Sequence, residues 1–269
     1  MLDTRARQRA GGMAVAVLFG ALSGLAGCAG GSSADPARAM DTSGALAPPA
    51  DASAALRMAR ATRRAGDLAA AISIYRTLVA NASAPAALKV EYGDTLLESG
   101  APDDAIDIYS QVGATSPARV DALLGITRAW LDLGEPAKAL DSADAARRLA
   151  PADGRVLVDR GVALDTLKRH AEAQQSYRAV LATAPREVSA RNNLALSLAL
   201  TGQFDEAVAL MAPLVRSSAA TPKIRGNMAV IYALKGDADN AATMSKVDLD
   251  DGATRDNLAF LAAVRDPGD

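Results

Sequence analysis

Few side chains in this 269-residue chain are of a type that does chemistry, and two of those types occur only once. The chain has a single cysteine, Cys28, and a single histidine, His170. One cysteine cannot form an internal disulfide, and one histidine with one cysteine cannot build a common zinc site. We therefore predict that the chain has no metal site.

The remaining polar groups do not form a recognisable catalytic set. No serine, cysteine or metal-ligand cluster accompanies His170, so we interpret it as a solvated or capping residue. Helix capping explains the adjacent acids Asp103 and Asp104, and the pair Asp250 and Asp251 lacks the further ligands that calcium needs. The glycines follow a repeat and form no phosphate-binding GxGxxG motif. We expect no catalytic residue, no cofactor and no enzyme activity.

The charge balance argues against nucleic acid as the main partner. The chain has 29 Lys and Arg residues against 31 Asp and Glu residues, a net charge of −2. Residues 1–27 hold three of the arginines and one aspartate, so the remainder carries 26 basic and 30 acidic residues, a net charge of −4. Binding to phosphates requires a clear basic face. We expect protein partners and no nucleic acid.

The sequence around Cys28 predicts that this residue carries lipid. A basic start with Arg5, Arg7 and Arg9 precedes an apolar run, 13–22, that is too short to span a bilayer. Leu25-Ala26-Gly27-Cys28 resembles the bacterial lipobox, which implies cleavage after residue 27 and lipidation of Cys28. More than one acyl chain on that residue would give stable anchoring. Residues 1–27 are then a lipoprotein signal peptide; the alternative is an ordinary signal peptide with a chance cysteine.

The residues after Cys28 predict a tether and a location. Position 29 is alanine, and in lipoproteins of this kind the absence of aspartate there favours the outer membrane, facing the periplasm. The segment 28–51 is rich in Gly, Ser, Ala, Asp and Pro and has no helical period. We interpret it as the lipidated cysteine and a flexible linker of 23 residues, whose root-mean-square reach is roughly 25–30 Å.

From residue 52 the chain repeats every 34 residues. Glycine recurs at one position of the repeat, except that lysine stands in the fourth unit: Gly66, Gly100, Gly134, Lys168, Gly202 and Gly236. Alanine always follows five residues later: Ala71, Ala105, Ala139, Ala173, Ala207 and Ala241. The glycine is expected to end a helix in the left-handed region, where lysine is tolerable but less favourable. A core rich in alanine, in a chain with only 3% aromatic residues, indicates closely packed helices.

This pattern resembles the tetratricopeptide repeat over 52–255, about three quarters of the chain. The resemblance implies an all-α fold, a right-handed superhelical solenoid of helix-turn-helix units that bury their apolar faces by stacking. The six expected units are 52–85, 86–119, 120–153, 154–187, 188–221 and 222–255. A last helix over 253–265 is expected to close the open end of the array.

Repeats of this kind usually bind partners through the concave face that their first helices form. In units five and six that face includes the residues that we predict as a peptide-binding surface: Asn192, Asn193, Leu196, Lys223, Asn227 and Val230. Asparagine side chains can both donate to and accept from the backbone of an extended peptide. The more ordinary interpretation, which we favour, is polar surface or local helix contacts.

The same face has a different character in the first two units. Unit one presents four arginines, which suit a solvated cap of the array: Arg57, Arg60, Arg63 and Arg64. Unit two presents the acidic residues Glu91, Asp94 and Glu98.

Three C-terminal stretches, 191–196, 225–232 and 256–261, look like the TadD family, tetratricopeptide lipoproteins of the tight-adherence (Flp) pilus. The resemblance implies a non-catalytic, pilotin-like scaffold that is anchored to the outer membrane by lipid and assists the pilus secretin. The alternative is an adaptor for another envelope machine, such as a cell-wall hydrolase, a protease or a polysaccharide synthesis complex.

Overall fold

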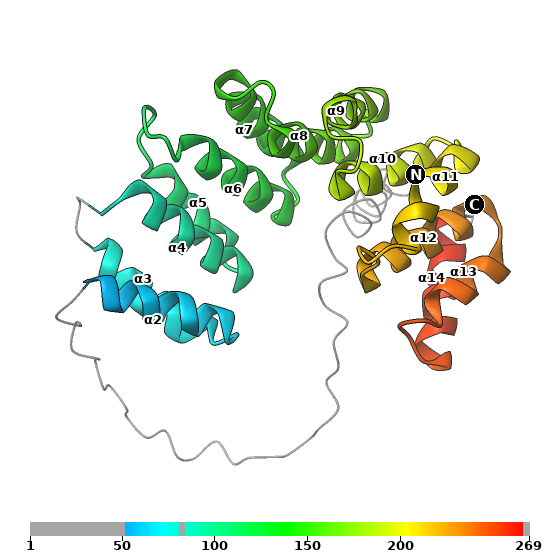
Figure 1. Ribbon diagram of the computed structural model, residues 1–269, viewed down its shortest axis with the longest axis horizontal. Helices are drawn as coiled ribbons and strands as arrows, with labels where there is room; N and C mark the ends of the chain where they lie inside the picture. Colours follow the sequence, from blue (N-terminus) through cyan, green and yellow to red (C-terminus); the bar gives the residue numbers. More distant parts are fainter. Residues whose placement is uncertain (1–51, 81–83, 266–269) are drawn as a thin grey trace, which may run out of the picture. The chain divides into compact units, whose positions relative to one another are not determined.

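The computed structural model describes residues 52–80 and 84–265, with side chains as far as Leu261. Within these residues there are thirteen helices and no strand, which confirms the all-α prediction (Figure 1). The predicted signal peptide, the lipidated Cys28 and the linker to residue 51 lie outside the described residues. None of the described helices combines the length and the apolar character needed to cross a membrane.

The described helices are 8 to 15 residues long and follow one another along the chain. They are α2 (Ala52–Arg64), α3 (Leu68–Val79), α4 (Ala86–Glu98), α5 (Pro102–Ser110), α6 (Arg119–Asp132), α7 (Pro136–Leu149), α8 (Gly154–Thr166), α9 (His170–Thr183), α10 (Val188–Leu200), α11 (Phe204–Val215), α12 (Pro222–Lys235), α13 (Ala238–Ser245) and α14 (Asp251–Arg265). Each 34-residue repeat contains a first helix with an even label, from α2 to α12, and a second helix with the next odd label.

The chain divides into two compact units within α6. We call the described residues up to Ala129 the N-terminal unit and those from Trp130 onward the C-terminal unit. In the N-terminal unit α2 packs on α3, α3 on α4, and α4 on α5. In the C-terminal unit each helix from α7 to α13 packs on the next, and the first helices α8, α10 and α12 also contact one another in turn.

The turn between the two helices of a unit has the same backbone geometry in all six repeats. The five glycines have φ between +71° and +88°, and Lys168 has φ of +62°, so the predicted left-handed conformation is confirmed at every turn. At Gly66 the amide donates to the carbonyl of Arg63, and the next amide, of Asp67, donates to the carbonyl of Thr62. The equivalent two bonds are present at each of the five remaining repeat turns, including the one at Lys168. They satisfy carbonyls that the end of a helix would leave unpaired.

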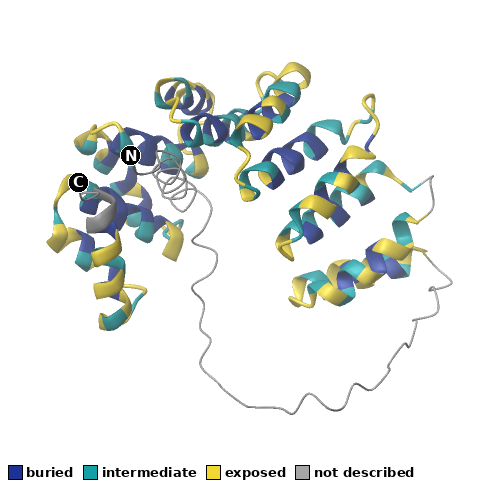
Figure 2. Cartoon of the chain, turned by 180° about the vertical axis from the view of Figure 1, so that it is seen from behind, coloured by how far each residue is buried: buried dark blue, intermediate teal, exposed yellow. Residues whose placement is uncertain are grey.

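The core depends on small residues set against large rings. All six repeat alanines are fully buried, and most helices show a buried side and an exposed side (Figure 2). The rings of Tyr75, Tyr109 and Tyr177 are also fully buried. The Tyr109 ring packs so closely against Gly93 and Gly125 that a Cβ atom on either glycine would lie within 3.0 Å of it. Glycine at these positions therefore lets a ring fill the space between helices.

The last described helix, α14, packs on α12 and α13. It begins two residues before the predicted start at residue 253, because Asp250 caps it: Oδ1 of Asp250 accepts from the amide of Ala253 at 2.8 Å. Leu261 is buried, whereas Phe260 remains 48% exposed.

One capping prediction is wrong. The N-cap of α5 is Ala101, without a side-chain bond, whereas Asp103 and Asp104 lie inside the first turn of that helix. There they face the positive end of the helix dipole, which is favourable for acidic side chains without any capping bond.

Candidate protein-binding surface

Three asparagines on α10 and α12 form a chain of amide hydrogen bonds in the C-terminal unit. Nδ2 of Asn227 donates to Oδ1 of Asn192 at 2.8 Å, and Nδ2 of Asn192 donates to Oδ1 of Asn193 at 3.0 Å. Asn193 and Asn227, which occupy the same repeat position, are therefore connected through Asn192. Oδ1 of Asn227 is buried without a hydrogen-bond partner, so this amide carries an unused acceptor.

The predicted surface is only partly accessible. Four of its six members are buried: Asn192, Leu196, Asn227 and Val230. Asn193 is half-buried and Lys223 is exposed, so a ligand would meet these two side chains first. The observed bonds are contacts between helices, of the kind that the more ordinary interpretation describes. Peptide capture by this surface stays a prediction.

A second polar cluster, which the sequence did not reveal, surrounds the carboxylate of Asp165 on α8. This side chain is fully buried, yet three donors reach it. Nδ1 of His170 lies 2.8 Å from Oδ1, the hydroxyl of Ser197 donates to the same oxygen at 2.7 Å, and the hydroxyl of Tyr177 donates to Oδ2 at 3.0 Å. Burial raises the pKa of Asp165, and the hydrogen bonds from the three donors oppose that rise.

Although serine, histidine and aspartate meet at this point, the arrangement differs from that of a hydrolase. The hydroxyl of Ser197 donates to the aspartate and not to the histidine, and Ser197 is fully buried. A nucleophile must be hydrogen-bonded to its base and must be reachable by substrate. The cluster instead joins α8, α9 and α10 beside the turn where lysine replaces the repeat glycine. The available signal was Asp165 itself, because leucine stands one and two repeats earlier, at Leu131 and Leu97.

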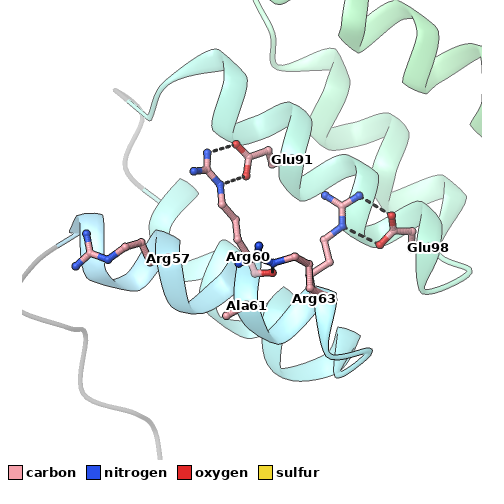
Figure 3. A pocket seen from close by; sticks show the side chains of 7 residues that line it. Arg57, Arg60, Ala61, Arg63, Glu91 and Glu98 are labelled. Carbon is pink, nitrogen blue, oxygen red and sulfur yellow. Dashed lines mark hydrogen bonds and ion pairs between the residues drawn. The ribbon is translucent and has the colours of Figure 1, made fainter.

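The N-terminal unit holds a set of charged side chains between α2 and α4 (Figure 3). The guanidinium of Arg60 binds the carboxylate of Glu91 through two bonds, of 2.8 and 2.5 Å, and Arg63 binds Glu98 through two bonds of the same lengths. The bonds from Arg60 lower the pKa of Glu91, and those from Arg63 lower the pKa of Glu98. These two arginines therefore bridge adjacent repeats, although the Arg60 side chain remains 50% exposed and that of Arg63 23% exposed.

No group of three or more His, Cys, Asp or Glu residues capable of holding a metal ion occurs in the described part of the chain.

Sequence comparison relates most of the array to known repeats. Residues 56–119 and 158–222 match one family model described as tetratricopeptide repeat, and residues 96–157 match a second model with the same description. A protein of Sinorhizobium fredii named as uncharacterized protein y4yS is 36% identical over 90 residues, which are 34% of this chain. The match spans 50% of the length of that relative.

Solved structures of tetratricopeptide proteins share the fold. A thermophilic protein of this type from Thermus thermophilus aligns over 66% of this chain and 98% of its own, with a TM-score of 0.57 and 21% identity. One from Parabacteroides merdae aligns over 78% of this chain and 98% of its own, with a TM-score of 0.53 and 16% identity. The Cut9–Hcn1 complex aligns over 78% of this chain and 43% of the matched chain, with a TM-score of 0.64 and 15% identity. At these identities the likeness concerns the fold alone.

Proposed function

We propose that this chain, which belongs to the tetratricopeptide repeat family, is a lipid-anchored periplasmic scaffold that helps to assemble a Flp/Tad-type pilus. Repeats of this family are protein-interaction modules, so the chain is a scaffold for protein–protein interaction. The observation that carries the finer proposal is the lipobox-like sequence ending at Cys28, a short linker ahead of the array. Lipid on that residue would hold the repeats at the periplasmic face of the outer membrane, where a pilus secretin assembles.

The segments that resemble TadD support the same role. They fall on α10, α12 and α14. These three helices pack in order, α10 on α12 and α12 on α14, within the C-terminal unit. A surface formed by helices that pack side by side is the kind of surface on which a repeat protein binds an extended segment of a partner. We propose that the secretin, or another pilus component, binds there.

The accessible end of the asparagine chain is the proposed point of contact. Asn193 is half-buried and can offer its amide to the backbone of a partner, and Lys223 can bind an acidic group beside it. Asn227 is unsuitable for a direct test because it is 1% exposed and bonded to Asn192. Its replacement would disturb packing as well as binding.

A pull-down from detergent-solubilised envelopes tests the proposal. The tagged full chain is expected to recover a secretin, and the variant Asn193→Ala/Lys223→Ala is expected to lose it. The control variant Gln175→Ala/Lys246→Ala changes an exposed amide and an exposed lysine elsewhere in the same unit and should retain it. Recovery of only a cell-wall hydrolase, a protease or a polysaccharide synthesis enzyme would refute the pilus role and favour the adaptor role.

The anchor has a separate test. The Cys28→Ser variant should leave the membrane fraction after ultracentrifugation of cell envelopes, whereas the wild-type chain should stay with it. A Cys28→Ser variant that still sediments with membranes and is extracted only by detergent would rule out lipidation at this residue.

A further inference from the structure

Between α2 and α4 the N-terminal unit contains a cavity of about 900 Å³. Its charged lining consists of four arginines of α2 and two glutamates of α4: Arg57, Arg60, Arg63, Arg64, Glu91 and Glu98. A cavity of this volume is within the range of sites that hold small ligands. Its lining is unusual for such a site because it carries four guanidinium groups and two carboxylates, two positive charges more than negative ones.

The two ion pairs bound the cavity on two sides (Figure 3). Arg60 and Arg63 are three residues apart, about 4.5 Å along their helix, whereas Glu91 and Glu98 are seven residues apart, about 10.5 Å. The two pairs therefore diverge as they run from α2 to α4, which leaves space between them. They also show which ligand chemistry this helix favours, since each guanidinium holds a carboxylate through two parallel bonds.

The other two arginines that line the cavity, Arg57 and Arg64, are bound to no carboxylate of the described residues. Nη1 of Arg57 donates to the hydroxyl of Ser53 at 3.1 Å, and Nε of Arg64 donates to the carbonyl of Arg60 at 3.3 Å. Both side chains are exposed, and neither forms an ion pair with any residue of the described chain. They are seven residues apart, so their Cα atoms lie on one side of α2, about 10.5 Å apart along the helix axis.

We propose that this cavity binds an acidic peptide segment of a protein partner, with carboxylates of the segment on Arg57 and Arg64. The inference rests on the proposed role as a protein-binding scaffold and names the chemistry of a partner, independently of whether that partner belongs to a pilus. An extended peptide rises about 3.3 Å per residue, so acidic residues three positions apart match the spacing of the two arginines.

The geometry favours a peptide over the other polyanions that arginine binds. A bilayer surface is flat and would meet Glu91 and Glu98 together with the arginines. A nucleic acid carries closely spaced phosphates, and the same two carboxylates would repel them. A peptide can place single carboxylates on the two unpaired guanidinium groups and leave the existing ion pairs intact.

Fluorescence anisotropy with a labelled peptide of six glutamates tests the inference, with a peptide of six glutamines as the neutral probe. The full chain in detergent micelles is expected to bind the glutamate peptide, more weakly at high salt because salt screens exposed charges. Arg57→Gln/Arg64→Gln should weaken binding by about tenfold or more, the loss expected when two charge-assisted contacts disappear. The control variant Arg148→Gln/Arg186→Gln removes two exposed arginines of the C-terminal unit and should bind as the wild type does.

Several results would overturn the inference. These are equal binding of the two peptides, or equal loss of binding in both double variants with unchanged circular dichroism. The inference would also be overturned if anionic vesicles or a single-stranded oligonucleotide bound more tightly than the glutamate peptide and did so through Arg57 and Arg64. Failure of the peptide to bind while envelope proteins are still captured removes only this inference. Peptide binding without capture of any envelope protein leaves this site standing and counts against the pilus role.

Discussion

Replacing Asp165 by leucine tests whether the buried carboxylate holds α8, α9 and α10 together. The third and second repeats have leucine at this position, Leu131 and Leu97, so a first helix tolerates leucine there. The variant deprives Tyr177 and Ser197 of their acceptor, and both residues are fully buried. His170, whose side chain is 19% exposed, can turn to water.

Each buried donor left without an acceptor lowers stability by about 1–3 kcal/mol. The serine hydroxyl can turn to a carbonyl of the preceding helical turn, which reduces its share. We therefore expect Asp165→Leu to lower the free energy of unfolding by about 2–4 kcal/mol. Urea denaturation followed by circular dichroism at the helical minimum measures this quantity.

The matched variant is Asp165→Leu/Tyr177→Phe/Ser197→Ala, which removes both hydroxyls together with their acceptor. Replacing all partners of a buried polar cluster by apolar groups is often neutral, so this variant should recover most of the lost stability. If the free energy of unfolding of Asp165→Leu lay within about 0.5 kcal/mol of the wild type, the range of an ordinary surface substitution, the reasoning would be refuted. A triple variant that is no more stable than the single one would do the same.

Three further predictions concern the turns, the core and the ion pairs. Lys168→Gly should raise the free energy of unfolding by about 1 kcal/mol, because lysine at φ +62° is strained where glycine is not, and a lower melting temperature would contradict this. Gly161→Ala should destabilise the chain by about 1–3 kcal/mol, since its Cβ would overlap a tyrosine ring, whereas Gly113→Ala, with open space around it, should leave the unfolding midpoint unchanged. The pKa of Glu91 is lowered chiefly by its bonds from Arg60, so its stabilising contribution is present above pH 4.5 and is lost as the pH falls further. Arg60→Gln should therefore make the acid limb of the stability profile shallower, and an unchanged acid limb would show that the pair does not contribute.

The turns and the core were predictable from the sequence because each depends on a single residue type at a fixed period. A left-handed turn selects glycine, and a close helix crossing selects alanine, so both appear as columns when the repeats are aligned. Even the exception could be anticipated, because Lys168 had to adopt the conformation that glycine adopts elsewhere.

The polar contacts could not be predicted in the same way. Arg60 binds Glu91 at a separation of 31 residues, whereas Asn227 binds Asn192 at a separation of 35. Both separations are close to one repeat, but which side chain reaches which depends on how far each helix is rotated and shifted against the next. That offset is set by core packing, which the periodicity of the sequence does not specify. The cluster at Asp165 was hidden for the further reason that its members come from three helices.

The packing of Tyr109 has a consequence for the motion of the N-terminal unit. Its ring is held between Gly93 on α4 and Gly125 on α6, at distances that leave no room for an added methyl group. A half-turn of the ring about its Cβ–Cγ bond sweeps a wider volume than the resting ring occupies, so the two helices must part before it can happen. The flip rate of this side chain, measured from the NMR line shapes of its ring protons, would therefore report how often α4 and α6 move apart.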